Sequence, residues 1–125
     1  MRLLLDTHVF LWAITGDARL KPASRRMIEA AEDVFVSAAS IWEIAIKAAL
    51  GKIAADVPVL AEAIAESGFA ELPVRAHHAA RVARLPMHHA DPFDRLLVAQ
   101  AVTEPLRLVT ADGALARYTD LVDVI

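Results

Sequence analysis

Four acidic residues, spread over the whole chain, stand where apolar segments begin or end: Asp6, Glu43, Asp94 and Asp112. Asp6 and Asp112 each follow a short apolar run that has the character of a buried strand. Glu43 is surrounded by apolar residues, and Asp94 falls in the first turn of a helix that we predict from Pro92. Carboxylates gathered in an apolar setting repel one another and lose hydration, so they need a compensating cation. The pattern therefore predicts a site for a hard divalent metal ion.

The chemistry that such a site performs is hydrolysis of a phosphodiester bond. Three or four carboxylates can hold one or two Mg²⁺ or Mn²⁺ ions and still leave coordination positions for water and a phosphate oxygen. A metal ion held in this way lowers the pKa of bound water, aligns it for in-line attack and stabilises the leaving oxygen. The four acids thus favour an enzyme that hydrolyses phosphodiester bonds with the help of a metal ion.

Two of the acids also have a purely structural explanation. Ser40 and Glu43 have the spacing of a capping box, and Glu43 could instead pair with Lys47 one helical turn later. The run 91–94 has an aspartate, a proline and a second acid at the positions that open a helix, so Asp91 is a predicted N-cap and Asp94 is favoured by the helix dipole.

The other two acids can be explained in the same way. Asp6 could cap a helix that starts at Thr7, and Asp112 could begin a turn with Gly113. Capping and metal binding do not exclude each other, however. A single shared site accounts for all four acids at once, whereas the structural explanations are four independent coincidences, so we favour the shared site.

The elements that must position these acids alternate between short apolar runs and helical patterns, which is typical of βαβ units around a parallel sheet. We predict strands at 2–5, 34–36, 69–72, 106–110 and 121–125, and helices at 7–15, 22–32, from 38–40 to 50, 58–67, 75–85, 92–103 and 113–118. Ligands of such sheets bind outside the carboxyl ends of the strands. Asp6 and Asp112 lie at that edge, and the helices that carry Glu43 and Asp94 can begin there.

Composition places the chain in one broad class. Its 125 residues fit one domain, 1–125, that buries roughly two-thirds of the surface of the unfolded chain. The hydrophobic fraction of 57% exceeds the roughly 45–50% of ordinary soluble domains, which suggests that some apolar surface meets a partner. With a net charge of −3, contact with nucleic acid must come from a local patch and from metal. We expect no disulfide and no thiolate site because there is no cysteine, and no membrane span, so we predict a cytoplasmic protein.

Four segments, in order along nearly the whole chain, resemble the PIN-domain family and, more closely, the VapC-like toxin ribonucleases of toxin–antitoxin pairs. They are Leu-Leu-Leu-Asp-Thr-His at 3–8, Ser-x-x-Ser-x-x-Glu at 37–43, His-x-Asp-Pro-Phe-Asp-Arg-Leu-Leu-x-Ala-Gln-Ala at 89–101 and Leu-Val-Thr-Ala-Asp at 108–112. The resemblance implies a PIN-like three-layer α/β/α fold whose central, mostly parallel sheet has about five strands. It also implies a Mg²⁺- or Mn²⁺-dependent endoribonuclease with an RNA substrate.

Carried over position by position, the family's acidic site falls on the four acids already named, with Thr7 and Thr110 as nearby polar residues. Asp91 belongs to the matching segment but is also explained as an N-cap. Arg95 is the basic residue best placed by sequence to contact a phosphate. The pairs His77-His78 and His88-His89 could suggest zinc, yet adjacent histidines in a loop point apart and no zinc-binding spacing supports them.

The resemblance also implies partners, namely a small antitoxin protein and a second copy of the chain in a homodimer. We expect the helices at 7–15 and 38–50 to wall a groove for an apolar antitoxin segment, because Phe10, Trp12, Trp42 and Ile46 provide more apolar surface than one core face requires. The antitoxin would inhibit by placing a basic side chain against the carboxylates.

Other classes of function fit the sequence less well. A haloacid-dehalogenase-type phosphatase needs a second aspartate two positions after the first, where this chain has His8. A response-receiver module needs an aspartate that ends a middle strand, where this chain has Val36-Ser37. The main alternative is a catalytically inactive PIN-like interaction module, and a nuclease assay with and without Mg²⁺ separates it from the enzyme.

Overall fold

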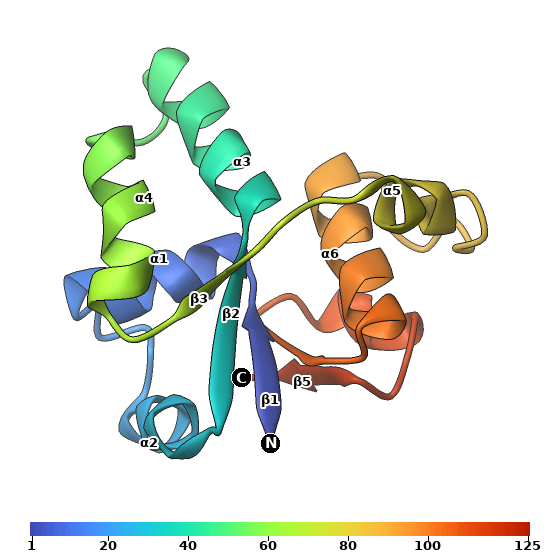
Figure 1. Cartoon of the computed structure of the whole chain (residues 1–125), viewed down its shortest axis with the longest axis horizontal. Helices are drawn as coiled ribbons and strands as arrows, with labels where there is room; N and C mark the ends of the chain where they lie inside the picture. Colours follow the sequence, from blue (N-terminus) through green and yellow to red (C-terminus); the bar gives the residue numbers. More distant parts are fainter.

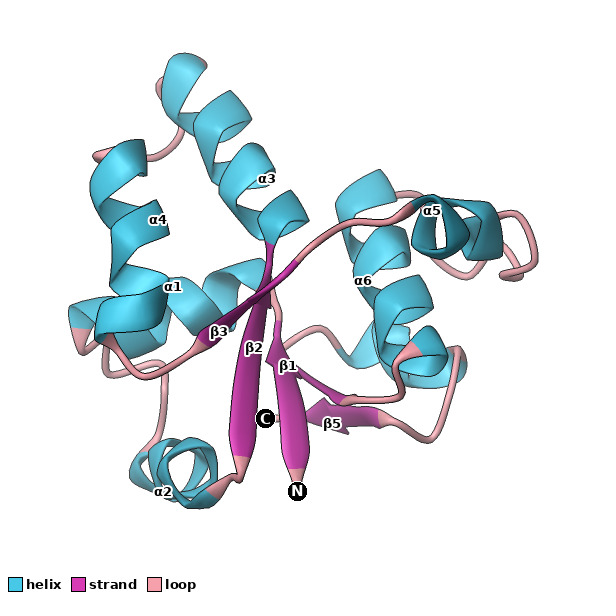
Figure 2. Ribbon diagram, in the orientation of Figure 1, coloured by secondary structure: helices cyan, strands magenta, loops and turns pink.

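The computed structural model describes residues 1–125 as one parallel sheet with helices on both faces (Figures 1 and 2). The five strands are β1 (Arg2–Leu5), β2 (Asp33–Ser37), β3 (Ala70–Leu72), β4 (Arg107–Thr110) and β5 (Val122–Val124), and they lie in the order β3-β2-β1-β4-β5. The six α-helices are α1 (Thr7–Thr15), α2 (Pro22–Ala30), α3 (Ala38–Ala49), α4 (Val57–Glu66), α5 (Ala76–Val82) and α6 (Pro92–Thr103), and a short 3₁₀ helix, η1, spans Gly113–Arg117. The expected fold class is confirmed.

Two hydrophobic cores cover the two faces of the sheet. Leu3 and Leu5 of β1 point into a core with residues of α1 to α4, whereas Leu4 points to the other side, into a core with residues of α6 and η1. Figure 1 shows α5 and α6 on the opposite side of β1 from α1 and α2. Because both faces are covered, the central strand is apolar at three consecutive positions, as is typical of parallel sheets.

Most predicted elements are present, with differences at their ends. Helix α5 stops at Val82, although the pattern predicted a helix to Leu85. The physical reason is that residues 83–85 turn away, and the guanidinium of Arg95 on α6 binds the carbonyl oxygens of Val82 and Leu85. Helix α2 ends at Ala30 rather than at Glu32, because the N–H of Glu32 already donates to the carbonyl oxygen of Met1 beside the sheet.

The predicted apolar surface was partly wrong. Phe10 is fully buried in the core beside β1, so it belongs to the interior and not to a partner surface. Trp42 and Ile46 on α3 are exposed at 61% and 38%, as expected for residues beyond the core. Trp12 is partly buried. None of the helices is both long and apolar enough to cross a membrane.

Candidate metal centre

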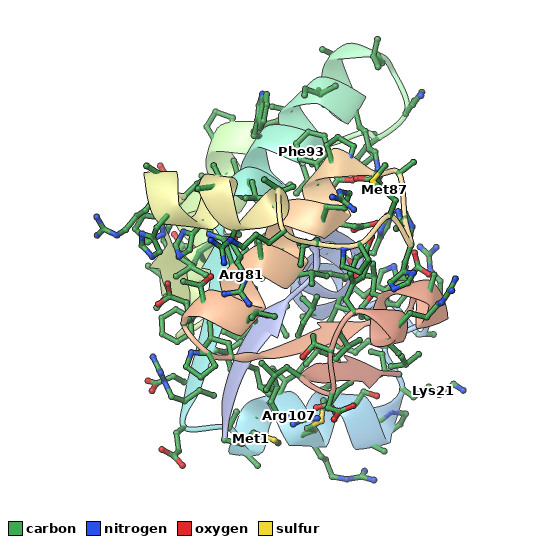
Figure 3. All side chains as sticks on the ribbon, turned by 90° about the vertical axis from the view of Figure 1, so that its right-hand side faces the viewer. Met1, Lys21, Arg81, Met87, Phe93 and Arg107 are labelled. Carbon is green, nitrogen blue, oxygen red and sulfur yellow. The ribbon has the colours of Figure 1, made fainter.

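Three of the predicted acids surround one cleft at the carboxyl edge of the sheet. In the register of the strands, Leu5 of β1 lies between Val36 of β2 and Val109 of β4, so the residues after these three strands meet at one edge. The cleft has a volume of about 310 Å³ and is lined by Asp6, His8, Trp12, Asp94, Ala111 and Asp112. In Figure 3, Phe93, the neighbour of Asp94, lies at the opposite end of the molecule from Met1 and Arg107 at the strand starts.

Asp6 has the structural role that its position predicted and faces the cleft as well. Its Oδ1 accepts a hydrogen bond of 2.8 Å from the N–H of Val9, so Asp6 is the N-cap of α1. Its Oδ2 accepts a 2.5 Å hydrogen bond from the hydroxyl of Thr110. Burial raises the pKa of Asp6 above its usual value, and the two hydrogen bonds oppose that shift.

Asp94 is the acid of the cleft whose carboxylate has the fewest stabilising contacts with the rest of the protein. Its carboxylate accepts no hydrogen bond, and its one ion-pair contact is with Nε2 of His89 at 3.7 Å. Burial and the neighbouring carboxylates of Asp91, Asp6 and Glu43 raise the pKa of Asp94 to about 7. A carboxylate without a donor, held among like charges, is the group that a bound cation would stabilise most.

Asp112 is linked to both neighbours. Its N–H donates to the hydroxyl oxygen of Thr110 at 3.0 Å, so that one hydroxyl connects Asp112 with Asp6. Its Oδ1 accepts from the N–H of Ala114 at the start of η1, as the turn-forming explanation predicted. Its Oδ2 lies 2.9 Å from Nε2 of His89.

Glu43 lies behind the cleft and does not line it. Its side chain is 4% exposed, and both oxygens are occupied: Oε1 accepts from the hydroxyl of Thr7 at 2.6 Å, and Oε2 accepts from Nζ of Lys47 at 2.6 Å. The i,i+4 pair is therefore confirmed, and the hydrogen bond to Glu43 raises the pKa of Lys47. Glu43 still acts on the cleft through its charge, which contributes to the raised pKa of Asp94.

The capping box that the sequence suggested at Ser40 is wrong. Helix α3 begins at Ala38, and Ser37 is its N-cap, with a 3.1 Å hydrogen bond from the N–H of Ala39 to the Ser37 hydroxyl. The hydroxyl of Ser40 lies 3.0 Å from that of Thr7. The motif Ser-x-x-Ser-x-x-Glu therefore places one serine at the helix start and a serine and a glutamate one and two turns on, both in contact with Thr7.

The two accessory residues of the 89–101 segment have structural contacts. Asp91 is the N-cap of α6, and its Oδ1 accepts from the N–H groups of Phe93 and Asp94. Arg95 donates from Nη1 to the carbonyl oxygen of Pro86 at 2.9 Å and to the hydroxyl of Tyr118 at 3.1 Å. Its guanidinium thus holds the loop between α5 and α6, which is a structural role, and the phosphate contact expected from the sequence stays a prediction.

The pair Asp91 and Asp94 allows a direct comparison of capping with metal binding. We expect Asp91→Ser to keep most of the activity and metal affinity, because serine caps helices about as well as aspartate. Asp94→Ser should lose both, since no other residue replaces its oxygens in the cleft. A Mn²⁺ titration and a nuclease assay on the two variants measure the difference, and equal losses in both would assign Asp91 to the site.

His89 is the residue of this site that the sequence reasoning missed. For His88 and His89 the prediction that adjacent histidines point apart is correct: His88 packs against Tyr118 with ring centroids 5.0 Å apart, whereas His89 turns toward Asp112. For His77 and His78 it is wrong, because on α5 their ring centroids lie 4.3 Å apart. The side-chain nitrogen or oxygen atoms of His89, Asp94 and Asp112 that could contact a metal ion lie within 4.8 Å of one another. The available signal was the position of His89 two residues before the N-cap of α6, which is where a loop side chain can reach the helix start.

The side chains present fit a hard divalent ion. The cleft offers carboxylate oxygens from Asp6, Asp94 and Asp112, which is the donor type that Mg²⁺ and Mn²⁺ prefer. No lysine or arginine lines it, so its negative charge is not neutralised from within. The cleft is also lined by the exposed residues His8 and Ala111, so it is open to solvent and has room for water and a substrate oxygen.

Known proteins resemble this chain in sequence or in fold. A 35% identical relative over 118 residues is Ribonuclease VapC22 of Mycobacterium tuberculosis, and the match covers 92% of this chain and 90% of the relative. VapBC2 from Rickettsia felis, solved bound to a promoter DNA fragment, has a TM-score of 0.72 at 16% identity, covering 99% and 98% of the two chains. A toxin-antitoxin complex from Klebsiella pneumoniae has a TM-score of 0.68 at 17% identity, covering 98% and 96%.

The family model for the PIN domain matches residues 3–121, which include every acid of the cleft. A match of this extent, together with a 35% identical relative that spans nearly the same length, establishes the family. The chain belongs to the PIN-domain family.

Proposed function

We propose that this chain is a Mg²⁺- or Mn²⁺-dependent endoribonuclease that acts as the toxin of a toxin–antitoxin pair. The observation that carries the proposal is the cleft in which Asp6, Asp94 and Asp112 face one another without a neutralising lysine or arginine. The family and the relatedness to a VapC ribonuclease support the same reading. The proposal includes all four predicted acids: Asp6, Asp94 and Asp112 as residues that hold the metal ion, and Glu43 as a residue that supports them.

Asp6, Asp94 and Asp112 would hold the metal ion, which supplies an activated water and stabilises charge on the phosphate. Thr110 keeps Asp6 and Asp112 in a fixed relation, because its one hydroxyl bonds to both residues. Glu43 supports the start of α1 by accepting a hydrogen bond from the hydroxyl of Thr7, the first residue of that helix. His8 and Trp12 line the open side of the cleft, where the RNA strand would enter.

The antitoxin would bind in a hollow that adjoins the acids. This hollow, of about 620 Å³, lies between α1, the segment 52–56 and α4, and its apolar lining includes Leu11, Trp12, Ile53 and Leu60. Its wall opposite α1 is therefore α4 and the segment before it, in place of the α3 wall that the sequence suggested. Because His8 and Trp12 line both the hollow and the acidic cleft, a segment lying in the hollow can extend a basic side chain to the carboxylates.

A second copy of the chain would cover the apolar surface formed by α3 and α6. Trp42 on α3 packs edge-on against Phe93 of α6, with ring centroids 5.1 Å apart. The two rings line a hollow of about 260 Å³ together with Val82, Pro92 and Leu96. Trp42 is exposed at 61%, and together with this hollow it forms a contiguous apolar surface of the kind that marks a contact site for another protein. Homodimers bury surfaces of this kind.

The test of the function is cleavage of RNA by the purified chain with Mg²⁺, with Mn²⁺ and with chelator. We expect cleavage with either ion, none with chelator, and none by an Asp6→Asn preparation purified in parallel, which controls for contaminating nucleases. Growth should stop when the chain is expressed alone and recover when a cognate antitoxin is co-expressed. A chain that binds Mn²⁺ but leaves RNA intact would instead be the inactive interaction module.

A further inference from the structure

His89 makes one hydrogen bond with each ring nitrogen. Its Nδ1 lies 3.0 Å from the backbone nitrogen of Asp91, and its Nε2 lies 2.9 Å from Oδ2 of Asp112 and 3.7 Å from Oδ2 of Asp94. The side chain is 24% exposed at the edge of the cleft. It therefore connects the turn that opens α6 with the loop that follows β4.

These contacts decide which nitrogen carries the proton. A backbone N–H can only donate, so Nδ1 of His89 must accept from Asp91 and cannot carry a proton while that bond exists. The single proton of the neutral ring then belongs to Nε2, where it points at the carboxylate of Asp112. In this tautomer Nε2 has no lone pair to offer, so His89 cannot ligate a metal without losing its bond to the Asp91 N–H.

We propose that His89 is a positioning residue of the metal centre, which fixes the Asp112 carboxylate opposite Asp94 and keeps the ligand set composed of oxygen atoms. The proposal rests on the metal site of the proposed function. Asp112 is 41% exposed on a loop, and while its Oδ1 is held by the N–H of Ala114, its Oδ2 has Nε2 of His89 as its one hydrogen-bond partner. The ring ties the two carriers together, since Nδ1 binds the N-cap turn of α6 and Nε2 binds Asp112.

The same bonding pattern occurs at His78, which shows what is particular about His89. His78 accepts from the N–H of Arg75 on Nδ1, and its Nε2 bonds to Glu104. His78 is fully buried and lines no part of the acidic cleft, so its bonds hold α5 against α6. At His89 the same donor nitrogen faces two carboxylates of the cleft.

Two conservative substitutions separate the two bonds of the ring. In His89→Asn the side-chain oxygen can take the place of Nδ1 and accept from the Asp91 N–H, but the side chain is too short to reach Asp112. In His89→Gln the amide N–H₂ can take the place of Nε2 and donate to Asp112, while the acceptor for the Asp91 N–H is lost. His88→Gln is the matched control, because His88 faces Tyr118 and not the cleft.

The measurements are Mn²⁺ and Zn²⁺ titrations by calorimetry and melting of the metal-free chain. We expect His89→Asn to weaken Mn²⁺ binding by about 10-fold or more, as is usual when a partner of a metal ligand is lost, with an almost unchanged metal-free melting temperature. His89→Gln should keep Mn²⁺ affinity within about 3-fold and melt slightly lower, and His88→Gln should match the unaltered chain on both counts. Zn²⁺ affinity should not fall more than Mn²⁺ affinity in either His89 variant.

Three results would overturn the assignment. The first is unchanged Mn²⁺ affinity in His89→Asn, which with intact RNA cleavage leaves the proposed function standing and removes only the role of His89. The second is an equal fall of affinity and melting temperature in both variants, which makes the ring a structural support alone. The third is a selective loss of Zn²⁺ affinity, which makes His89 a ligand.

Discussion

Asp94→Asn is expected to raise the melting temperature of the metal-free chain at pH 8 and to abolish both its stabilisation by Mn²⁺ and its cleavage of RNA. The increase follows from the surroundings of Asp94, which burial and three neighbouring carboxylates make unfavourable for a negative charge. Asparagine removes that charge at nearly the same size. Relief on the order of 2 kcal/mol would raise the melting temperature of a domain of this length by roughly 5–10 °C.

The loss of metal-linked behaviour should be much larger than the gain in stability. A metal ion contributes several kcal/mol of transition-state stabilisation, so its loss should lower the cleavage rate by about 10³-fold or more. Differential scanning calorimetry with and without Mn²⁺, and a cleavage time course, measure both effects. Glu62→Gln is the control, because Glu62 is an exposed acid on α4 away from the cleft, and it should change neither quantity.

Two results for the melting temperature of Asp94→Asn would contradict the shared metal site. If Mn²⁺ raised the melting temperature of the Asp94→Asn variant as much as that of the unaltered chain, the ion would bind elsewhere. If the substitution lowered the metal-free melting temperature at pH 8, the carboxylate would stabilise the fold, and the crowding of like charges inferred for the cleft would be wrong.

The sequence predicted the strands well because a parallel sheet buried on both faces leaves a strong local signal. The run Leu3–Leu5 is apolar at consecutive positions, as is typical of a strand covered on both sides. The carboxyl ends of parallel neighbours in register lie at one edge, so the residue after β1 and a residue just past β4 had to meet. The sequence therefore placed Asp6 and Asp112 at one edge, and the pairing of β1 with β4 in the structure makes them neighbours there.

Contacts made by long-range packing were beyond local patterns. The hydrogen bond of Glu43 to Thr7 depends on how α3 lies against α1, whereas its pair with Lys47 followed from the i,i+4 spacing. The spacing of Ser40 and Glu43 suggested a cap that does not form. The position of His89 depends on the loop before α6, which the guanidinium of Arg95 holds by donating to the carbonyl oxygen of Pro86. No periodic pattern encodes a loop of this kind, so its side chains could not be placed in advance.

Binding of Mn²⁺ is expected to weaken steeply as the pH falls below about 7, because the metal must displace a proton from Asp94, whose pKa is raised to about 7. Between pH 7.5 and pH 5.5 the ionised fraction of such a group falls by roughly 25-fold, and the apparent affinity should fall by a similar factor. An ordinary aspartate with a pKa near 3.8 would produce almost no change over this range. Calorimetric titrations at the two pH values measure the ratio.

The stability of the metal-free chain provides an independent check, with the sign fixed by linkage. The folded-state pKa of Asp94 is raised from 3.8 to about 7, so between these values the folded chain binds more protons than the unfolded chain does. Its free energy of unfolding therefore decreases as the pH rises through this window, and the decrease is complete above about pH 7. The gain from Asp94→Asn should accordingly be largest at pH 8 and vanish near pH 4, where Asp94 is protonated and neutral in the unaltered chain. A gain of equal size at both pH values would show that the substitution acts through packing rather than through charge.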